Sequence, residues 1–165
     1  MSLKPTSNYA VPAQTAAVAK AAFPKGTLCL AIYDELGPIF KDQDFAEVFP
    51  SGGQPAQAPF RLALVTILQY VEGLSDRQAA DAVRSRIDWK YLLGLELEDA
   101  GFNFSVLSEF RDRLLAGGLE QCLLTHLLDV IKARGLAKGR VATRTDSTHV
   151  LAAVREMGSP KKVRI

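Results

Sequence analysis

The chain has 165 residues, of which 48% are hydrophobic and 23% are charged, and its formal net charge is +2. This length accommodates one domain, or one domain with part of a second, and the hydrophobic content is sufficient for a buried core. No apolar run reaches the roughly 18 residues of a membrane span, the N-terminus lacks the apolar core of a secretion signal, and the two cysteines match no metal-ligand spacing. Membrane and disulfide-stabilised secreted proteins are therefore excluded, and a cytoplasmic protein is expected.

The first part of the chain gives weak helical signals and ends in a linker. An Ala-rich stretch at residues 13–22 is compatible with a loose helix or a mobile segment. The apolar residues 28–39 indicate a short helix that Gly37-Pro38 interrupts, and residues 45–49 have helical spacing. Residues 50–59 contain three prolines and two glycines, which is typical of a linker.

The helical signal is much stronger after this linker. Apolar residues repeat at helical spacing from Leu64 to Val71, and Gly73 predicts the end of that helix. Ser75 and Gln78 then form the sequence pattern of a capping box, which marks the start of a second helix. The pair, expected at 62–72 and 75–86, has the size and turn chemistry of a helix-turn-helix.

Further elements follow in chain order. The buried face of the second helix is expected to continue to Ile87, and a short segment with Trp89 in the core is expected to end at Gly94. Two more helices are predicted at 105–116 and 119–133. Residues 140–145 have β-branched side chains at alternate positions, which predicts a strand.

The second helix of the pair carries basic side chains suited to DNA contact. The candidate residues are Arg77, Arg84 and Arg86, with Lys90 one turn further along. Arginine bonds guanine edges bidentately and attracts phosphates, so such a helix can recognise DNA. The alternative is an ordinary solvated surface, because Arg77–Asp81 and Arg84–Asp88 have the i, i+4 spacing of ion pairs. The pattern alone leaves both interpretations open.

A candidate metal ligand lies near the end of the chain. Asp146 follows the predicted strand, and His149 lies close enough to act as a second ligand, an orienting partner or a proton shuttle. An Asx-type turn is the alternative role for this aspartate. Metal-dependent phosphoryl transfer requires further carboxylates from elsewhere in a fold. Residues 138–165 hold seven basic and two acidic side chains, which suits either nucleic-acid contact or a solvated tail.

Four stretches together carry a resemblance to a known family. They are Phe60–Val65, Glu72–Ala80, Val106–Arg111 and Arg144–Val150. In this order they resemble the N-terminal part of bacterial insertion-sequence transposases of the DDE class with an InsH-type N-terminal domain.

The resemblance implies both a function and a site. A helical domain would bind double-stranded DNA at the terminal inverted repeats, and an RNase H-like domain would cut and rejoin DNA with two Mg²⁺ or Mn²⁺ ions. Asp146 would be the first catalytic aspartate and a metal ligand, and Arg144 beside it is expected to contact DNA. The expected fold is mainly α, with a helix-turn-helix-like pair in a helical bundle, followed by the first strand or hairpin of an incomplete RNase H-like domain.

The expected organisation has three parts. They are a loosely helical region with its linker at 1–59, a helical DNA-binding domain at 60–137, and the start of a catalytic domain with a basic tail at 138–165. The family's second aspartate and its glutamate would lie beyond residue 165, and residues 157–165 depart from the family pattern. We therefore expect a truncated transposase that binds inverted repeats, is inactive alone and binds no metal itself.

The expected assemblies are a homo-oligomer or a mixed oligomer with full-length transposase, with no membrane involved. One alternative is an active transposase completed by a downstream reading frame. Another is a helical interaction module that does not bind DNA.

Overall fold

The computed structural model describes residues 2–6, 8–50, 52–53 and 55–133. In this part the elements are α1 (Ala13–Ala22), α2 (Leu28–Leu36), the 3-10 helix η1 (Asp42–Val48), α3 (Pro59–Glu72), α4 (Asp76–Ser85), α5 (Ile87–Leu93), α6 (Ser105–Ala116) and α7 (Glu120–Ala133). The prediction of a mainly α fold is confirmed, and the described residues contain an isolated β-bridge but no strand. The strand predicted at 140–145 lies outside them.

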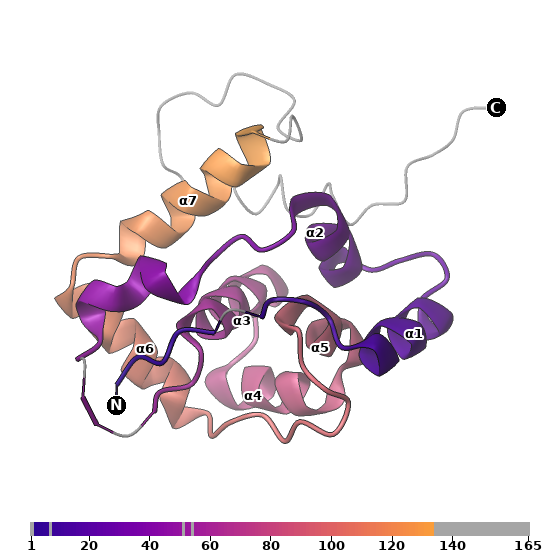
Figure 1. Cartoon of the computed structure of the whole chain (residues 1–165), viewed down its shortest axis with the longest axis horizontal. Helices are drawn as coiled ribbons and strands as arrows, with labels where there is room; N and C mark the ends of the chain where they lie inside the picture. Colours follow the sequence, from indigo (N-terminus) through magenta and orange to yellow (C-terminus); the bar gives the residue numbers. More distant parts are fainter. Residues whose placement is uncertain (1, 7, 51, 54, 134–165) are drawn as a thin grey trace.

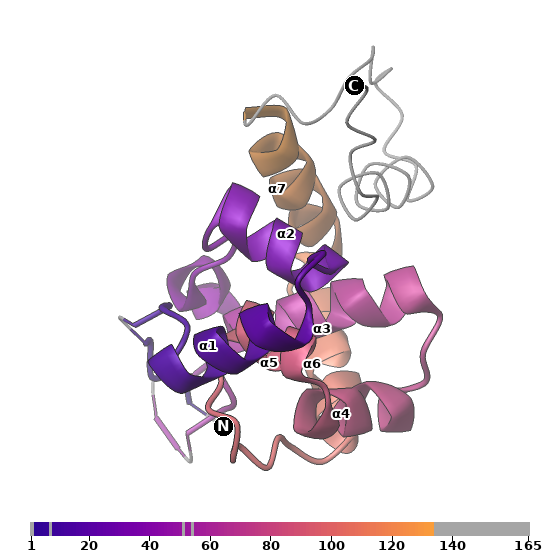
Figure 2. The same ribbon diagram turned by 90° about the vertical axis from the view of Figure 1, so that its right-hand side faces the viewer.

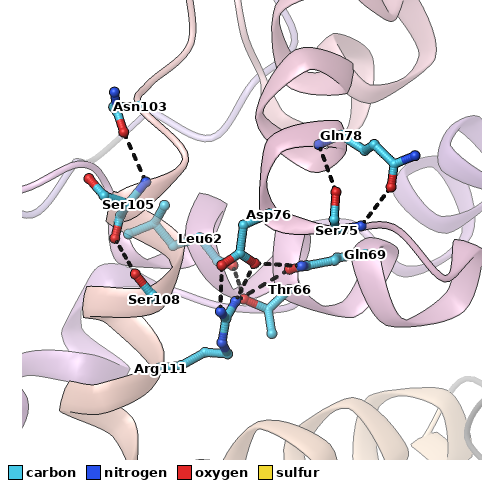
Figure 3. A network of polar contacts seen from close by, with 10 residues as sticks. All are labelled: Leu62, Thr66, Gln69, Ser75, Asp76, Gln78, Asn103, Ser105, Ser108 and Arg111. Atoms are coloured by element: carbon cyan, nitrogen blue, oxygen red, sulfur yellow. Dashed lines mark hydrogen bonds and ion pairs between the residues drawn. The ribbon is translucent and has the colours of Figure 1, made fainter.

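The turn between α3 and α4 follows the chemistry expected from the sequence. Gly73 ends α3 in the left-handed conformation, with φ 68°, which glycine adopts without a steric penalty. Ser75 caps α4 by accepting a hydrogen bond from the backbone N–H of Gln78, whose side chain accepts one from the N–H of Ser75 (Figure 3). The predicted capping box is therefore confirmed.

The second helix of the pair ends earlier than the apolar pattern predicts. The backbone at Arg86 is extended, with φ −93° and ψ 122°, so Ile87 begins α5 instead of continuing α4. Trp89 on α5 is completely buried, as predicted, and Gly94 ends this helix.

Helix α3 occupies the centre of the arrangement (Figures 1 and 2). It contacts α4, α6 and η1, whereas α5 contacts α1, α2 and α4. One cluster of buried apolar side chains draws members from both sides of the 50–59 linker, among them Phe40, Phe45, Leu68 and Phe110. Residues before and after the linker therefore share a core.

A buried carboxylate joins the N-terminal segment to the start of α3. Asp42 is 0% exposed and accepts hydrogen bonds from the backbone N–H groups of Thr6, at 2.9 Å, and Phe60, at 3.1 Å. The N-cap residue Ala58 has no side chain that can accept a bond from the first turn of α3. Asp42 therefore supplies the cap from another part of the chain.

Candidate nucleic-acid interface

Helix α4 has one buried and one solvated face. The buried face consists of the small residues Ala79, Ala80, Ala82 and Val83, which allow close packing against the rest of the bundle. The exposed side chains are Arg77, Gln78, Asp81, Arg84 and Ser85. Two of the four basic candidates, Arg77 and Arg84, therefore lie on the same exposed face, two helical turns apart.

A surface groove separates this face from the connection between α5 and α6, which runs beside α4 in Figure 1. Its volume is about 140 Å³, and its lining is Arg77, Ala80, Asp81, Arg84, Phe102, Asn103 and Phe104. The guanidinium carbon of Arg77 lies 4.4 Å from the centre of the Phe104 ring. Arg84 donates through Nε to the carbonyl of Ala100 at 3.2 Å. The groove thus combines two cationic side chains with the aromatic residue Phe104, which is 36% exposed.

The start of α4 is held by an ion pair from α6 (Figure 3). Arg111 donates two hydrogen bonds to Asp76, at 2.9 and 2.7 Å, and Gln69 of α3 donates to the same carboxylate at 2.6 Å. The hydrogen bond from Arg111 is the main reason why the pKa of Asp76 lies below its ordinary value. This network links three helices and fixes the position of α4 relative to α3 and α6.

Arg86 lies between two carboxylates. It forms ion pairs with Glu72 of α3 and with Asp88 of α5, the latter at 2.6 Å, and its guanidinium lies 5.2 Å from the centre of the Trp89 ring. Desolvation lowers the pKa of Arg86, but the hydrogen bonds and charges of Asp88 and Glu72 outweigh it and raise the pKa above its ordinary value. Its positive charge is therefore compensated within the protein.

Lys90 is also engaged within the protein. Its side chain is buried, and its ammonium group donates to the backbone carbonyls of Asp99, at 2.6 Å, and Glu96, at 3.4 Å. Burial lowers the pKa of this ammonium from its ordinary value. The side chain thus anchors α5 to the loop that follows it.

The ion pairs expected from i, i+4 spacing on α4 do not form. Asp81 pairs with Arg84 instead of Arg77, at 3.5 Å, and both side chains are largely exposed. Asp88 pairs with Arg86, because the chain turns out of α4 at that residue. Arg77 instead lies over the ring of Phe104.

The remaining predicted site residues, Arg144, Asp146 and His149, lie outside the described residues. Within the described part of the chain, no group of three or more His, Cys, Asp or Glu side chains is placed to hold a metal ion. The same part contains no helix with the length and apolar character needed to cross a bilayer.

Three groove residues, Phe102, Asn103 and Phe104, were not predicted as site residues from the sequence. Phe104 lies far from Arg77 along the chain, so no local pattern connects them. Asn103 carries a local signal, because its side-chain oxygen accepts a hydrogen bond from the Ser105 N–H at 3.0 Å, an Asx arrangement expected just before a helix.

A family model described as Transposase domain (DUF772) matches residues 18–113. This segment covers more than half of the chain and includes all residues of the groove. The chain belongs to this transposase domain family. No curated protein and no solved structure matches the chain significantly. The exposed arginines of α4 and the aromatic residue beside them are therefore features of a transposase domain.

Proposed function

We propose that this transposase domain binds double-stranded DNA through the exposed face of α4, at the terminal inverted repeats of an insertion sequence. The observation that carries the proposal is the placement of Arg77 and Arg84. Both are exposed on one face of the second helix of a tight helix pair, and both line the same groove. In helix-turn-helix proteins this second helix enters the major groove of DNA.

The electrostatics of the surrounding residues support this choice of surface. Asp76, adjacent to Arg77, is engaged by Arg111, and Glu72 is engaged by Arg86. These carboxylates therefore repel an approaching phosphate less than free carboxylates would. Asp81 is the acidic residue of the groove, and its pair with Arg84 is too exposed to be strong. Phosphate contact can replace that pair.

The proposed DNA-binding set is smaller than the set named from the sequence. Arg86 and Lys90 are excluded from it because protein groups already engage their charges. Their role in the proposal is to hold α5 in place. Arg144 stays a predicted DNA contact.

The catalytic part of the proposal rests on the resemblance to DDE-class transposases with an InsH-type N-terminal domain. Asp146 would be the first catalytic aspartate of an RNase H-like domain and a ligand of Mg²⁺ or Mn²⁺. The described residues do not themselves provide a metal site, and no step of the proposed binding function passes through a metal. Homo-oligomers, or mixed oligomers with a full-length transposase, would bring two element ends together.

Fluorescence anisotropy at graded salt concentrations tests DNA binding. The full chain is titrated into labelled duplexes carrying the element's terminal inverted repeats, and into unrelated duplexes of equal length. We expect tighter binding to the repeats, and an affinity that falls with salt by a slope of roughly −0.9 per neutralised phosphate.

The Arg77→Ala/Arg84→Ala double variant should reduce the magnitude of the salt slope by about 0.9 for each phosphate that these two arginines neutralise. Arg86→Ala is the comparison variant, tested at a temperature where it is folded, and it should keep the slope of the wild type. Equal affinity for repeats and unrelated duplexes would contradict inverted-repeat recognition. Absence of salt-dependent binding would contradict DNA binding altogether.

A further inference from the structure

Arg77 differs from the other basic residues near α4 in having a positioned guanidinium whose donors are free. It lies over the face of Phe104, with 4.4 Å between the guanidinium carbon and the ring centre. Among the described residues it has no hydrogen-bond acceptor and no ion-pair partner. An aromatic ring covers one face of a guanidinium, whereas the N–H donors point outward in its plane. The stacking therefore orients Arg77 without using its donors.

Arg84 is held in a different way. Its Nε donates to the carbonyl of Ala100, and its terminal nitrogen lies 3.5 Å from the carboxylate of Asp81. A guanidinium already bonded through Nε and paired with a carboxylate has fewer donors left to bond two base atoms at once. Its remaining contribution is charge, which suits a phosphate.

From this difference we infer that Arg77 is the specificity-determining residue of the interface and reads a guanine edge, whereas Arg84 contacts the DNA backbone. A planar guanidinium bonds guanine O6 and N7 together in the major groove, and a guanidinium that is already oriented loses less side-chain entropy in doing so. Arg77 also lies in the first turn of α4, the part of a recognition helix that reaches base edges. The inference rests on the proposed function and adds the base that is read.

Phe104 acts in this scheme as a positioning residue. It immediately precedes α6, whose first turn is set by the hydrogen bond from the Ser105 N–H to Asn103. Further along α6, Arg111 binds Asp76 at the start of α4, and Gln69 of α3 donates to the same carboxylate (Figure 3). The ring and the helix that carries Arg77 are thus both anchored to α6, which keeps the stacking geometry fixed.

Selection from a randomised duplex library tests the inference, because such a library presents all candidate sequences at once. Duplexes with a randomised central segment are incubated with the full chain, and bound sequences are recovered and sequenced. We expect the wild type to enrich guanine at a defined position by roughly tenfold or more over other bases. Arg77→Ala should abolish that enrichment while leaving the other enriched positions in place.

Three further variants sharpen the result. Arg84→Ala is the matched control, with the same substitution on the same helix face, and should keep the enriched guanine while weakening binding to all duplexes. Arg77→Gln should shift the preference at that position toward adenine, because a glutamine amide matches the adenine edge. Phe104→Leu should weaken the guanine preference, since the apolar volume remains but the aromatic face is lost. Circular dichroism establishes that each variant is folded.

The outcomes separate the inference from the proposed function. If Arg77→Ala and Arg84→Ala alter the enriched sequences equally, or if Arg77→Ala keeps the guanine, the base-reading role is wrong while DNA binding stands. If the folded wild type retains no duplex even at low salt, DNA binding itself fails and the role of Arg77 fails with it.

Discussion

The exposed face of α4 and the junction of α4 with α5 carry basic residues of similar chemistry in opposite situations. On the face, Arg77 and Arg84 are exposed and line a groove. At the junction, Arg86 is bracketed by Glu72 and Asp88, and Lys90 is buried against backbone carbonyls. Basic residues close together in the sequence therefore need not share a role. The chain leaves α4 at Arg86, and from that residue on the cations meet protein groups instead of solvent.

Removing the charge of Arg86 should give the largest effect on stability. Arg86→Met leaves Asp88, whose side chain is 7% exposed, and Glu72 without their cation. Breaking a buried ion pair costs several kcal/mol, and partial exposure of Arg86 reduces our expectation to about 2 kcal/mol of unfolding free energy. Urea unfolding followed by circular dichroism measures it.

Arg84→Met makes the same chemical change on the exposed face and serves as the control for that experiment. Its unfolding free energy should stay within about 0.5 kcal/mol of the wild type. Equal destabilisation by both variants would remove the distinction between the two regions.

Acid should lower the unfolding free energy by weakening the ion pair that attaches α4 to α6. We expect this effect to be smaller than that of Arg86→Met. The pKa of Asp76 is held below its ordinary value mainly by hydrogen bonding from Arg111. Its stabilising contribution is therefore present above the unfolded-state pKa of about 4 and is lost as the pH falls through the folded-state pKa. Arg111→Met should lower the unfolding free energy near neutral pH by about 1–2 kcal/mol.

Urea midpoints near neutral pH and in acid check this dependence. The wild type should lose more stability on acidification than Arg111→Met, which has already lost the ion pair. Asp112 is an exposed neighbour of Arg111 on α6, and Asp112→Asn should keep the pH dependence of stability seen in the wild type. An Arg111→Met variant with the full acid sensitivity of the wild type would show that Asp76 is not its source.

The smallest expected effect is a gain in DNA binding. Asp81→Asn removes the negative charge of the groove and frees Arg84, with which Asp81 is paired at 3.5 Å. Affinity for unrelated duplex at low salt should rise about two- to threefold, because one repulsive charge near the phosphates is gone. Glu47→Gln changes the net charge equally at an exposed position of η1 and should raise affinity less. Equal gains would indicate that net charge alone governs binding.

The sequence predicts those parts of the fold that depend on residues close together in the chain. Gly73 and the Ser75–Gln78 capping box mark the α3–α4 turn because their geometry involves a few neighbouring residues. The burial of Trp89 follows from its apolar surroundings in sequence. Each of these features is set by neighbouring residues in the sequence, and the packing of the bundle preserves it.

The candidate interface depends on contacts between distant residues. Local spacing favours an Arg77–Asp81 pair, but the loop before α6 presents Phe104 to Arg77 instead. Lys90 looks like one more cation beyond α4, yet the loop carrying Asp99 covers it. The path of the α5–α6 connection decides both outcomes, and no local periodicity encodes that path.

The cap that Asp42 provides for α3 shows that residues before the matched segment take part in the folded domain. Its carboxylate joins the backbone N–H of Thr6 to that of Phe60, and the buried Thr15 hydroxyl donates to the carbonyl of Leu95 at 2.7 Å. Both tethers start before residue 18, where the matched segment begins. A fragment cut to the matched segment would thus expose a carboxylate and a carbonyl that the longer chain keeps satisfied, so expression designs should start at the N-terminus.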